Sequence, residues 1–250
     1  SIGPPIHLKF NTGLNRLGFR ENDISDIADL LKSSPSIRVA SVFSHIAASE
    51  DPKEKPFTLQ QITHFNECFD ELVTRLGYRL KKHMLNTSGI VNYAAIAQFD
   101  MVRSGIGLYG FGNEKNITTQ LKSVVQLHSV ISQIHEVNKG DSVGYNRAFY
   151  SNRCMRIATI PIGHADGISR RFGEGVGYAF VNGQKAPYVG NVCMDMLMID
   201  VTDITCSEGD KVNIYRDQEH IEDMAQRIGT IPYELMTAVS QRIKKILKKC

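Results

Sequence analysis

The chain has 250 residues, and 42% of them are hydrophobic, which allows a substantial core and excludes a disordered chain. Its 29 basic and 26 acidic residues leave a formal net charge of +3, too balanced to favour nucleic acid or a membrane surface as a partner. The five cysteines are scattered and form no C-x-x-C pair, which favours a reduced, cytoplasmic protein without structural zinc. No apolar run has the length of a membrane span, and we expect no metal site.

Residues 1–115 alternate predicted strands and helices, which is the pattern of parallel βα units. Runs of β-branched and apolar residues predict strands at Ile6–Phe10, Ile37–Phe43, His83–Leu85 and Phe99–Val102. Apolar residues at helical spacing predict helices at Asp23–Ser33, Thr58–Leu76 and Ile90–Ile96. We expect Asn22 and Thr58 to cap the first two helices, and Gly77 to end the second.

From residue 116 the pattern is mainly β, which predicts a second domain over residues 116–250. Strands are predicted at Leu121–Val137, Met155–Ile162, Asn191–Val201 and Lys211–Tyr215. The dipeptide Asn182-Gly183 predicts a hairpin, because both residues accept the positive φ of its tight turn. Two short helices are predicted around Ile221–Ile228 and Tyr233–Val239.

The segment Gly105–Gly110 spells G-x-G-x-x-G, the fingerprint of dinucleotide-binding folds. That fingerprint requires a helix directly after it and an acidic residue on a second strand. Here Phe111–Thr119 is predicted to be a loop, followed by β structure. We therefore interpret the backbone N–H groups of Gly105 and Ile106 as facing an anion instead.

A second anion-binding segment, Asn86-Thr87-Ser88-Gly89, lies between a predicted strand and the start of a helix. A hydroxyl and free N–H groups suit phosphate there, although a plain helix cap is the alternative. A (β/α) barrel commonly holds phosphate between the loops that follow its last two strands. The βα pattern ends just after Gly105 and Ile106, so we expect the anion between Thr87 and these two residues.

Other polar residues near the strands have ordinary interpretations when each is taken alone. Arg16 would be a surface arginine, and His45, which could bond an arginine, would be a structural histidine. Lys9 lies inside a predicted strand, where a buried lysine needs a partner or a modification. Cys193-Met194-Asp195 carries no signal without its flanking residues.

Taken together and in order, these motifs resemble those of the alanine racemases, enzymes that use pyridoxal 5′-phosphate (PLP). The resemblance covers His7–Phe19, Ser44–Asp51, Asn86–Gly89, Met101–Gly110, Gly140–Tyr145, Ile160–Gly167, Asn182–Val201 and Ile231–Glu234. It implies an α/β (β/α)8 barrel of TIM type, of which only the second half is expected here, followed by a mainly β C-terminal domain. It also implies interconversion of L- and D-alanine for the peptidoglycan of the cell wall, by a head-to-tail homodimer that shares its active sites.

The resemblance gives several residues a role toward the cofactor. Arg103 resembles the arginine that faces the pyridine nitrogen of PLP, and His45 the histidine that orients it. An arginine keeps its proton, so the pyridine nitrogen stays unprotonated and the ring is a weaker electron sink. Thr87, Gly105 and Ile106 resemble ligands of the cofactor phosphate.

Other residues resemble groups that act on the substrate. Arg16 resembles the arginine near the cofactor hydroxyl and the substrate carboxylate, and Lys9 the lysine that is often carbamylated to pair with it. Met194 and Asp195 resemble the loop that the partner subunit contributes. His164 stands where the family has a tyrosine in G-Y-A-D-G, which would make this histidine the second catalytic base.

Two further departures from the family pattern affect the expected activity. No segment resembles V-K-A-N-A-Y-G-H-G, which carries the lysine that binds PLP, so we expect a C-terminal portion that is inactive alone. Gln241 stands where the family often has a tyrosine that reaches the phosphate.

Two alternatives remain open at this point. One is a racemase for another small amino acid such as serine. The other is a non-catalytic dimerisation domain fused to a cell-wall ligase, which His164 and Gln241 favour. The retained Arg16, His45 and Arg103 count against the second alternative.

Overall fold

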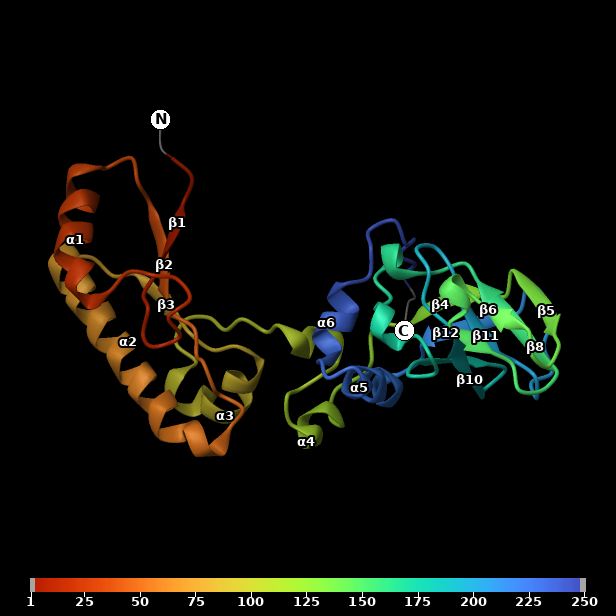
Figure 1. Ribbon diagram of the computed structural model, residues 1–250. Helices are drawn as coiled ribbons and strands as arrows, with labels where there is room; N and C mark the ends of the chain where they lie inside the picture. The colour runs from red at the N-terminus through yellow and green to blue at the C-terminus, as the bar shows by residue number, and fades with distance from the viewer. Residues whose placement is uncertain (1–2, 248–250) are drawn as a thin grey trace. The chain divides into compact units, whose positions relative to one another are not determined.

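A computed structural model describes residues 3–247 (Figure 1). The chain forms two compact units, and the boundary between them lies between Lys122 and Ser123. Within the described residues, no helix is both long and apolar enough to cross a membrane.

The N-terminal unit contains a parallel sheet with the strand order β1–β2–β3. Its strands are β1 (Ile6–Lys9), β2 (Val39–Phe43) and β3 (Lys81–His83). Its helices are α1 (Ile24–Ser33), α2 (Lys55–Leu76), α3 (Thr87–Ala97) and the short α4 (Lys115–Thr118). Figure 1 shows α1 and α2 along one side of these strands. Because the strands are parallel, their carboxyl ends share one edge, where the loops of α/β proteins bind ligands.

An apolar core joins α1 and α2 to the sheet. The predicted stripe of α2 is buried at every position, namely at Ile62, Phe65, Phe69, Leu72 and Leu76. Phe10 on the end of β1 and Val42 on β2 are fully shielded from solvent and belong to the same core. Burial of one such side chain contributes about 1.5–3 kcal/mol, so this stripe is the main force that fixes α2.

The predicted helix caps were wrong, although the helices were located. A 3-10 turn over Glu21–Asp23 precedes α1, and the N–H of Arg20 donates to the Asp23 carboxylate at 2.7 Å. Thr58 lies inside α2, because a 3-10 turn capped by Asp51 leads into the helix three residues earlier. The prediction that Gly77 ends α2 is confirmed by its left-handed φ of 75°.

The predicted strand at Phe99–Val102 does not form. Only Met101 makes an isolated parallel bridge, to His83. Phe99 has a φ of 51°, which breaks an extended conformation, and the Asp100 carboxylate accepts the N–H of Lys82 at 2.9 Å. The chain therefore turns beside β3 instead of extending the sheet.

The C-terminal unit is built on a seven-stranded antiparallel sheet with the order β4–β12–β9–β10–β11–β8–β5. The strands are β4 (Leu127–Val130), β5 (Gln133–Val137), β8 (Met155–Ile160), β9 (Tyr178–Val181), β10 (Gln184–Val189), β11 (Leu197–Asp200) and β12 (Lys211–Tyr215). A two-stranded sheet pairs β6 (Ser142–Val143) with β7 (Phe149–Tyr150), and two helices follow, α5 (Gln218–Arg227) and α6 (Pro232–Thr237). The predicted hairpin is confirmed, with φ of 49° at Asn182 and 80° at Gly183.

Two predicted strands of this unit were too long. The stretch Leu121–Val137 divides into β4 and β5, which pair with β12 and β8 at opposite ends of the sheet order. The break lies at Ile131, whose N–H donates to the Asp210 carbonyl at 2.9 Å. In the predicted strand Asn191–Val201 only Leu197–Asp200 is extended in the sheet, and the residues before it form a loop.

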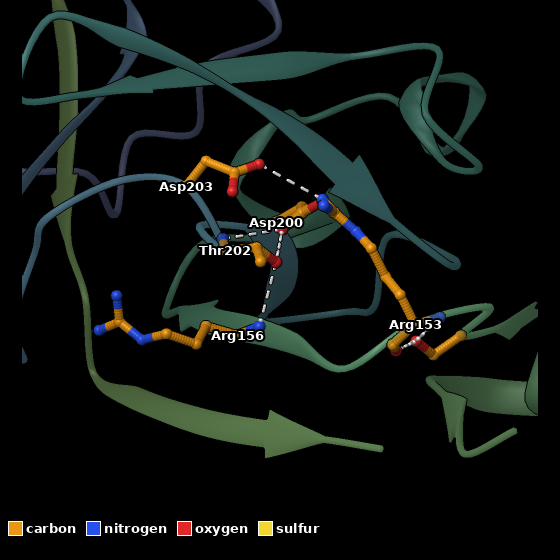
Figure 2. A network of polar contacts seen from close by, with 6 residues as sticks. Arg153, Arg156, Asp200, Thr202 and Asp203 are labelled. Atoms are coloured by element: carbon orange, nitrogen blue, oxygen red, sulfur yellow. Dashed lines mark hydrogen bonds and ion pairs between the residues drawn. The ribbon is translucent and has the colours of Figure 1, made fainter. Parts of the chain in front are cut away.

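A polar network fixes the chain after β11, as Figure 2 shows. The Asp200 carboxylate accepts the N–H and the hydroxyl of Thr202, at 2.9 and 2.5 Å. The Thr202 oxygen in turn accepts the N–H of Arg156 on β8 at 3.1 Å. The Arg153 guanidinium lies 3.6 Å from Asp200 and 3.4 Å from Asp203, so one arginine serves two carboxylates.

Candidate functional site

The guanidinium of Arg103 lies among groups from the carboxyl ends of β2 and β3. Its Nη2 donates to the carbonyl oxygens of Ser44 and Met84, at 2.8 and 3.2 Å, and to His45 Nδ1 at 3.1 Å. Its Nη1 contacts His83 Nδ1. The structure thus brings Arg103 and His45 together and holds the arginine between two histidines.

His83 is a site residue that the sequence analysis missed. An arginine only donates, so His83 Nδ1 is the acceptor and the ring proton lies on Nε2. That nitrogen is 2.9 Å from the hydroxyl of Ser41, which is 2.6 Å from His7 Nδ1. His7 and Ser41 are paired in the parallel register of β1 and β2. The available signal was a polar residue at the end of a strand, as at His45.

Burial and positive charge keep both histidines neutral. Burial, and then the charge of Arg103, lowers the pKa of His45 to about 4 and that of His83 to about 4. Burial also lowers the pKa of Arg103 from its usual value. The site is therefore a single fixed positive charge with two neutral partners across the physiological pH range.

We predict that His45 and His83 will titrate near pH 4 in NMR spectra of the protein, rather than near the ordinary histidine value of ~6.5. Unfolded histidines take up protons below ~6.5, whereas these two do not until about 4, so stability falls as the pH drops through that interval. Ring C–H chemical shifts, followed together with urea unfolding, measure both effects. Titration of both rings near 6.5 would contradict the described arrangement.

Lys9 lies beside the loop that carries Arg16. Its amine donates to the carbonyl of Leu17 at 2.5 Å, and the lysine is only 9% exposed. Burial first, and then the charges of Arg16 and Arg103, lowers the pKa of Lys9. Arg16 itself is exposed on this loop, which folds back because the N–H of Phe19 donates to the Lys9 carbonyl at 2.8 Å.

The expected phosphate segment has a tightly packed backbone. Asn86 is the N-cap of α3, and its side-chain oxygen accepts the N–H of Gly89 at 2.9 Å. The Thr87 hydroxyl is therefore not used to cap the helix. The Thr87 hydroxyl oxygen accepts the N–H groups of Gly105 and Gly107, at 3.0 and 3.2 Å. A Cβ at Gly107 would lie 2.9 Å from both the Thr87 methyl group and the Ser104 hydroxyl oxygen, so a side chain there would push these groups away. Ile106, buried, begins the 3-10 turn that follows.

His164, Met194 and Asp195 come together in the C-terminal unit. The N–H of His164 donates to the Cys193 carbonyl and that of Ala165 to the Met194 carbonyl, both at 2.9 Å. Met194 and Asp195 are exposed on this loop. His164 also lines a pocket of about 210 Å³, whose wall includes Arg170 and Glu234.

Arg242 is a second residue that the sequence analysis missed. Its Nε and Nη2 donate to the two carboxylate oxygens of Asp166 at 2.6 and 3.1 Å, and Nη2 also donates to Asp195 at 2.6 Å. The signal in the sequence was its position next to Gln241, inside the segment that departs from the family pattern.

Comparison with known proteins identifies the family of both units. Residues 3–112 match the family described as alanine racemase, N-terminal domain, and residues 124–247 match alanine racemase, C-terminal domain. The chain is 36% identical to alanine racemase 2 of Caldanaerobacter subterraneus subsp. tengcongensis, over 96% of this chain and 63% of that protein. It is 31% identical to the alanine racemase of Helicobacter pylori (strain Shi470), over 96% of this chain and 67% of that protein. The chain belongs to the alanine racemase family.

The architecture agrees with that of solved alanine racemases. A superposition on the Bartonella henselae alanine racemase with covalently bound pyridoxal phosphate gives a TM-score of 0.78 at 29% identity, over 97% of this chain and 66% of that one. The predicted order of a βα unit before a β-rich unit is therefore the order of the racemase family. The chain spans between 63% and 67% of the length of these three relatives.

Proposed function

We propose that this chain provides part of the active site of a PLP-dependent alanine racemase. The observation that carries the proposal is the Arg103 guanidinium, held by His45 and His83 at the carboxyl ends of parallel strands. Such a site fits the pyridine nitrogen of PLP, because a permanently protonated group between neutral partners offers N–H donors and no proton to lose.

When bound, PLP draws electrons from the Cα of an amino acid and so makes its hydrogen acidic. Arg103 would hold the ring nitrogen by a hydrogen bond and, because it keeps its own proton, would leave that nitrogen unprotonated and limit this effect. His83 and His45 fix the orientation of the Arg103 guanidinium, because both accept hydrogen bonds from its N–H groups. This arrangement would favour return of a proton to Cα over side reactions.

The N-terminus of α3 and the turn beside it fit a phosphate. The Thr87 oxygen already accepts two backbone N–H groups, so its own hydroxyl proton is available to an anion. The positive end of the helix dipole adds to this attraction. We assign Thr87 and Ile106 to the phosphate. The N–H of Gly105, which was expected to face the anion, donates instead to the Thr87 oxygen, so Gly105 and Gly107 orient the Thr87 hydroxyl.

Lys9 is the proposed carbamylated lysine beside Arg16. Its lowered pKa leaves more of the amine neutral, and a neutral amine adds to CO2 with loss of one proton to give a negatively charged carbamate. That change replaces repulsion from Arg16 by attraction. We predict a carbamate carbon signal in NMR spectra of protein equilibrated with 13C-bicarbonate, lost in Lys9→Gln. A signal that survives this substitution would exclude Lys9 as its source.

His164 is the proposed second base, with Met194 and Asp195 beside it at the substrate.

We further propose that β1, β2 and β3 belong to a (β/α)8 barrel, supported by their parallel order and by the helices that follow β2 and β3. A homodimer is proposed as the working form, because Met194 and Met196 expose apolar side chains on the loop that carries Asp195. Sedimentation of the PLP-loaded enzyme tests this; a monomer with full activity would refute it.

The decisive experiment expresses the longest product of the gene, loads it with PLP, and measures D-alanine formed from L-alanine. Alanine turnover well above serine turnover supports the proposal. Faster serine turnover would make this a racemase of another amino acid. An assembled dimer that binds PLP without racemising either amino acid would support the dimerisation alternative instead.

A further inference from the structure

One arginine holds two loops of the C-terminal unit through their carboxylates. Arg242 makes a two-pronged contact with Asp166 and a single contact with Asp195, with the shortest distance to each 2.6 Å. The Asp166 side chain is 4% exposed, whereas those of Asp195 and Arg242 are about half exposed, at 52% and 50%. Removing the arginine would leave the buried Asp166 carboxylate without its charged partner, which is costly.

The Asp166 carboxylate also fixes the turn that contains His164. One carboxylate oxygen accepts the N–H of Gly163 at 2.9 Å, and the backbone carbonyl of Asp166 accepts the N–H of Ser240 at 3.0 Å. On the other side of the turn, the N–H groups of His164 and Ala165 donate to the loop that carries Asp195. Three segments distant in sequence are therefore joined at one place, and Arg242 spans all of them.

The charges explain why an arginine is needed there. Asp166 and Asp195 contact the same guanidinium, so without it two carboxylates would share one site. The hydrogen bonds from Arg242 lower the pKa of Asp166, which keeps this carboxylate ionised and the contact intact at neutral pH. A lysine would supply the charge but not the two parallel N–H donors.

We propose that Arg242 is a positioning residue for racemisation, which holds the His164 turn against the Met194–Asp195 loop. This inference rests on the proposed function, because it concerns where the second base lies. Arg242 acts through its contacts to Asp166 and Asp195. A displacement of a reacting group by about 1 Å can cost on the order of 100-fold in rate.

The test compares Arg242→Met and Arg242→Lys with the parent in the PLP-loaded, full-length enzyme. We expect racemisation to fall about 10- to 100-fold in Arg242→Met, with an intermediate loss in Arg242→Lys and partial rescue of Arg242→Met by added guanidinium. Exchange of the Cα hydrogen of one enantiomer with D2O should persist, because the opposite base is not moved. Parallel loss of racemisation and exchange would indicate only a structural defect and overturn the proposal.

The matched control is Arg153→Met, which also removes a half-exposed arginine (52%) from two aspartates of the same unit (Figure 2). It should leave racemisation within about twofold. A readout independent of activity is hydrogen exchange of the His164 and Ala165 amides, which should be faster in Arg242→Met and unchanged in Arg153→Met. Unchanged exchange in both variants would refute the positioning role of Arg242. A parent enzyme that racemises neither enantiomer would refute the proposed function, but the amide-exchange result would still apply.

Discussion

Replacing Gly167 by alanine is expected to cost at least about 3 kcal/mol of unfolding free energy. Gly167 has a φ of +101°, a conformation that a side chain rarely adopts. In addition, a Cβ there would lie 2.2 Å from the carbonyl oxygen of Ala238, a backbone atom that cannot rotate away. Conformational strain and backbone overlap therefore add.

The control for this prediction is Gly209→Ala. Gly209 has a similar φ of +92°, but nothing lies within 4 Å of the Cβ position. Only the conformational penalty remains, about 1–2 kcal/mol. Urea unfolding of both variants separates the two contributions, and equal losses would contradict the close packing at Gly167.

These glycines illustrate what the sequence could and could not predict. The glycine-rich segment Gly105–Gly110 was interpreted as facing an anion, and close backbone approaches occur both there and in the segment Ile160–Gly167. The approach, however, is made by the protein itself: Gly163 faces the carbonyl oxygens of Cys193 and Met194, and Gly107 faces Thr87. The spacing of glycines reveals that a side chain would clash, but not with which atoms.

Local features of the fold were predictable because they depend on neighbouring residues. Gly77 ends α2 and Asn182-Gly183 forms its hairpin, since each requires only a particular φ. The limits of strands depend on partners elsewhere. The division of Leu121–Val137 and the absence of a strand at Phe99–Val102 follow from pairing with β12, β8 and β3, which periodicity does not encode.

The candidate site likewise contains some residues that the sequence predicted and others that it did not. Arg103 and His45 were singled out by their motifs, and the structure brings them together. His83 lies 20 residues from Arg103, and Arg242 lies 76 from Asp166. A histidine that ends a strand and an arginine in a C-terminal segment are common, so only the fold reveals that each of them completes a polar cluster.

Replacing His164 by alanine in the full-length enzyme is expected to lower racemisation by about 100-fold or more, the usual contribution of a general base. Racemisation requires two bases on opposite faces of Cα, and we propose that His164 is one of them. The two enantiomers are equally stable, so kcat/KM must fall equally in both directions. The rate alone thus cannot reveal which face has lost its base.

Hydrogen exchange in D2O supplies that information. With His164→Ala, the remaining base still removes and returns the Cα hydrogen of one enantiomer, which therefore acquires deuterium without racemising. The other enantiomer should neither exchange nor racemise. If His164 only fills space, both enantiomers will keep exchanging and racemisation will stay near its normal rate.

His164→Tyr provides the matched variant, because it restores the residue type that the family has at this position. A phenol is a much weaker acid than an imidazolium ion, so the tyrosine needs neighbouring positive charge to act as a base at neutral pH. The tyrosine variant should therefore regain exchange of both enantiomers, but with a pH–rate profile that rises at higher pH than that of the histidine enzyme. An identical profile for the two enzymes would show that the residue at position 164 is not the group whose ionisation limits the rate.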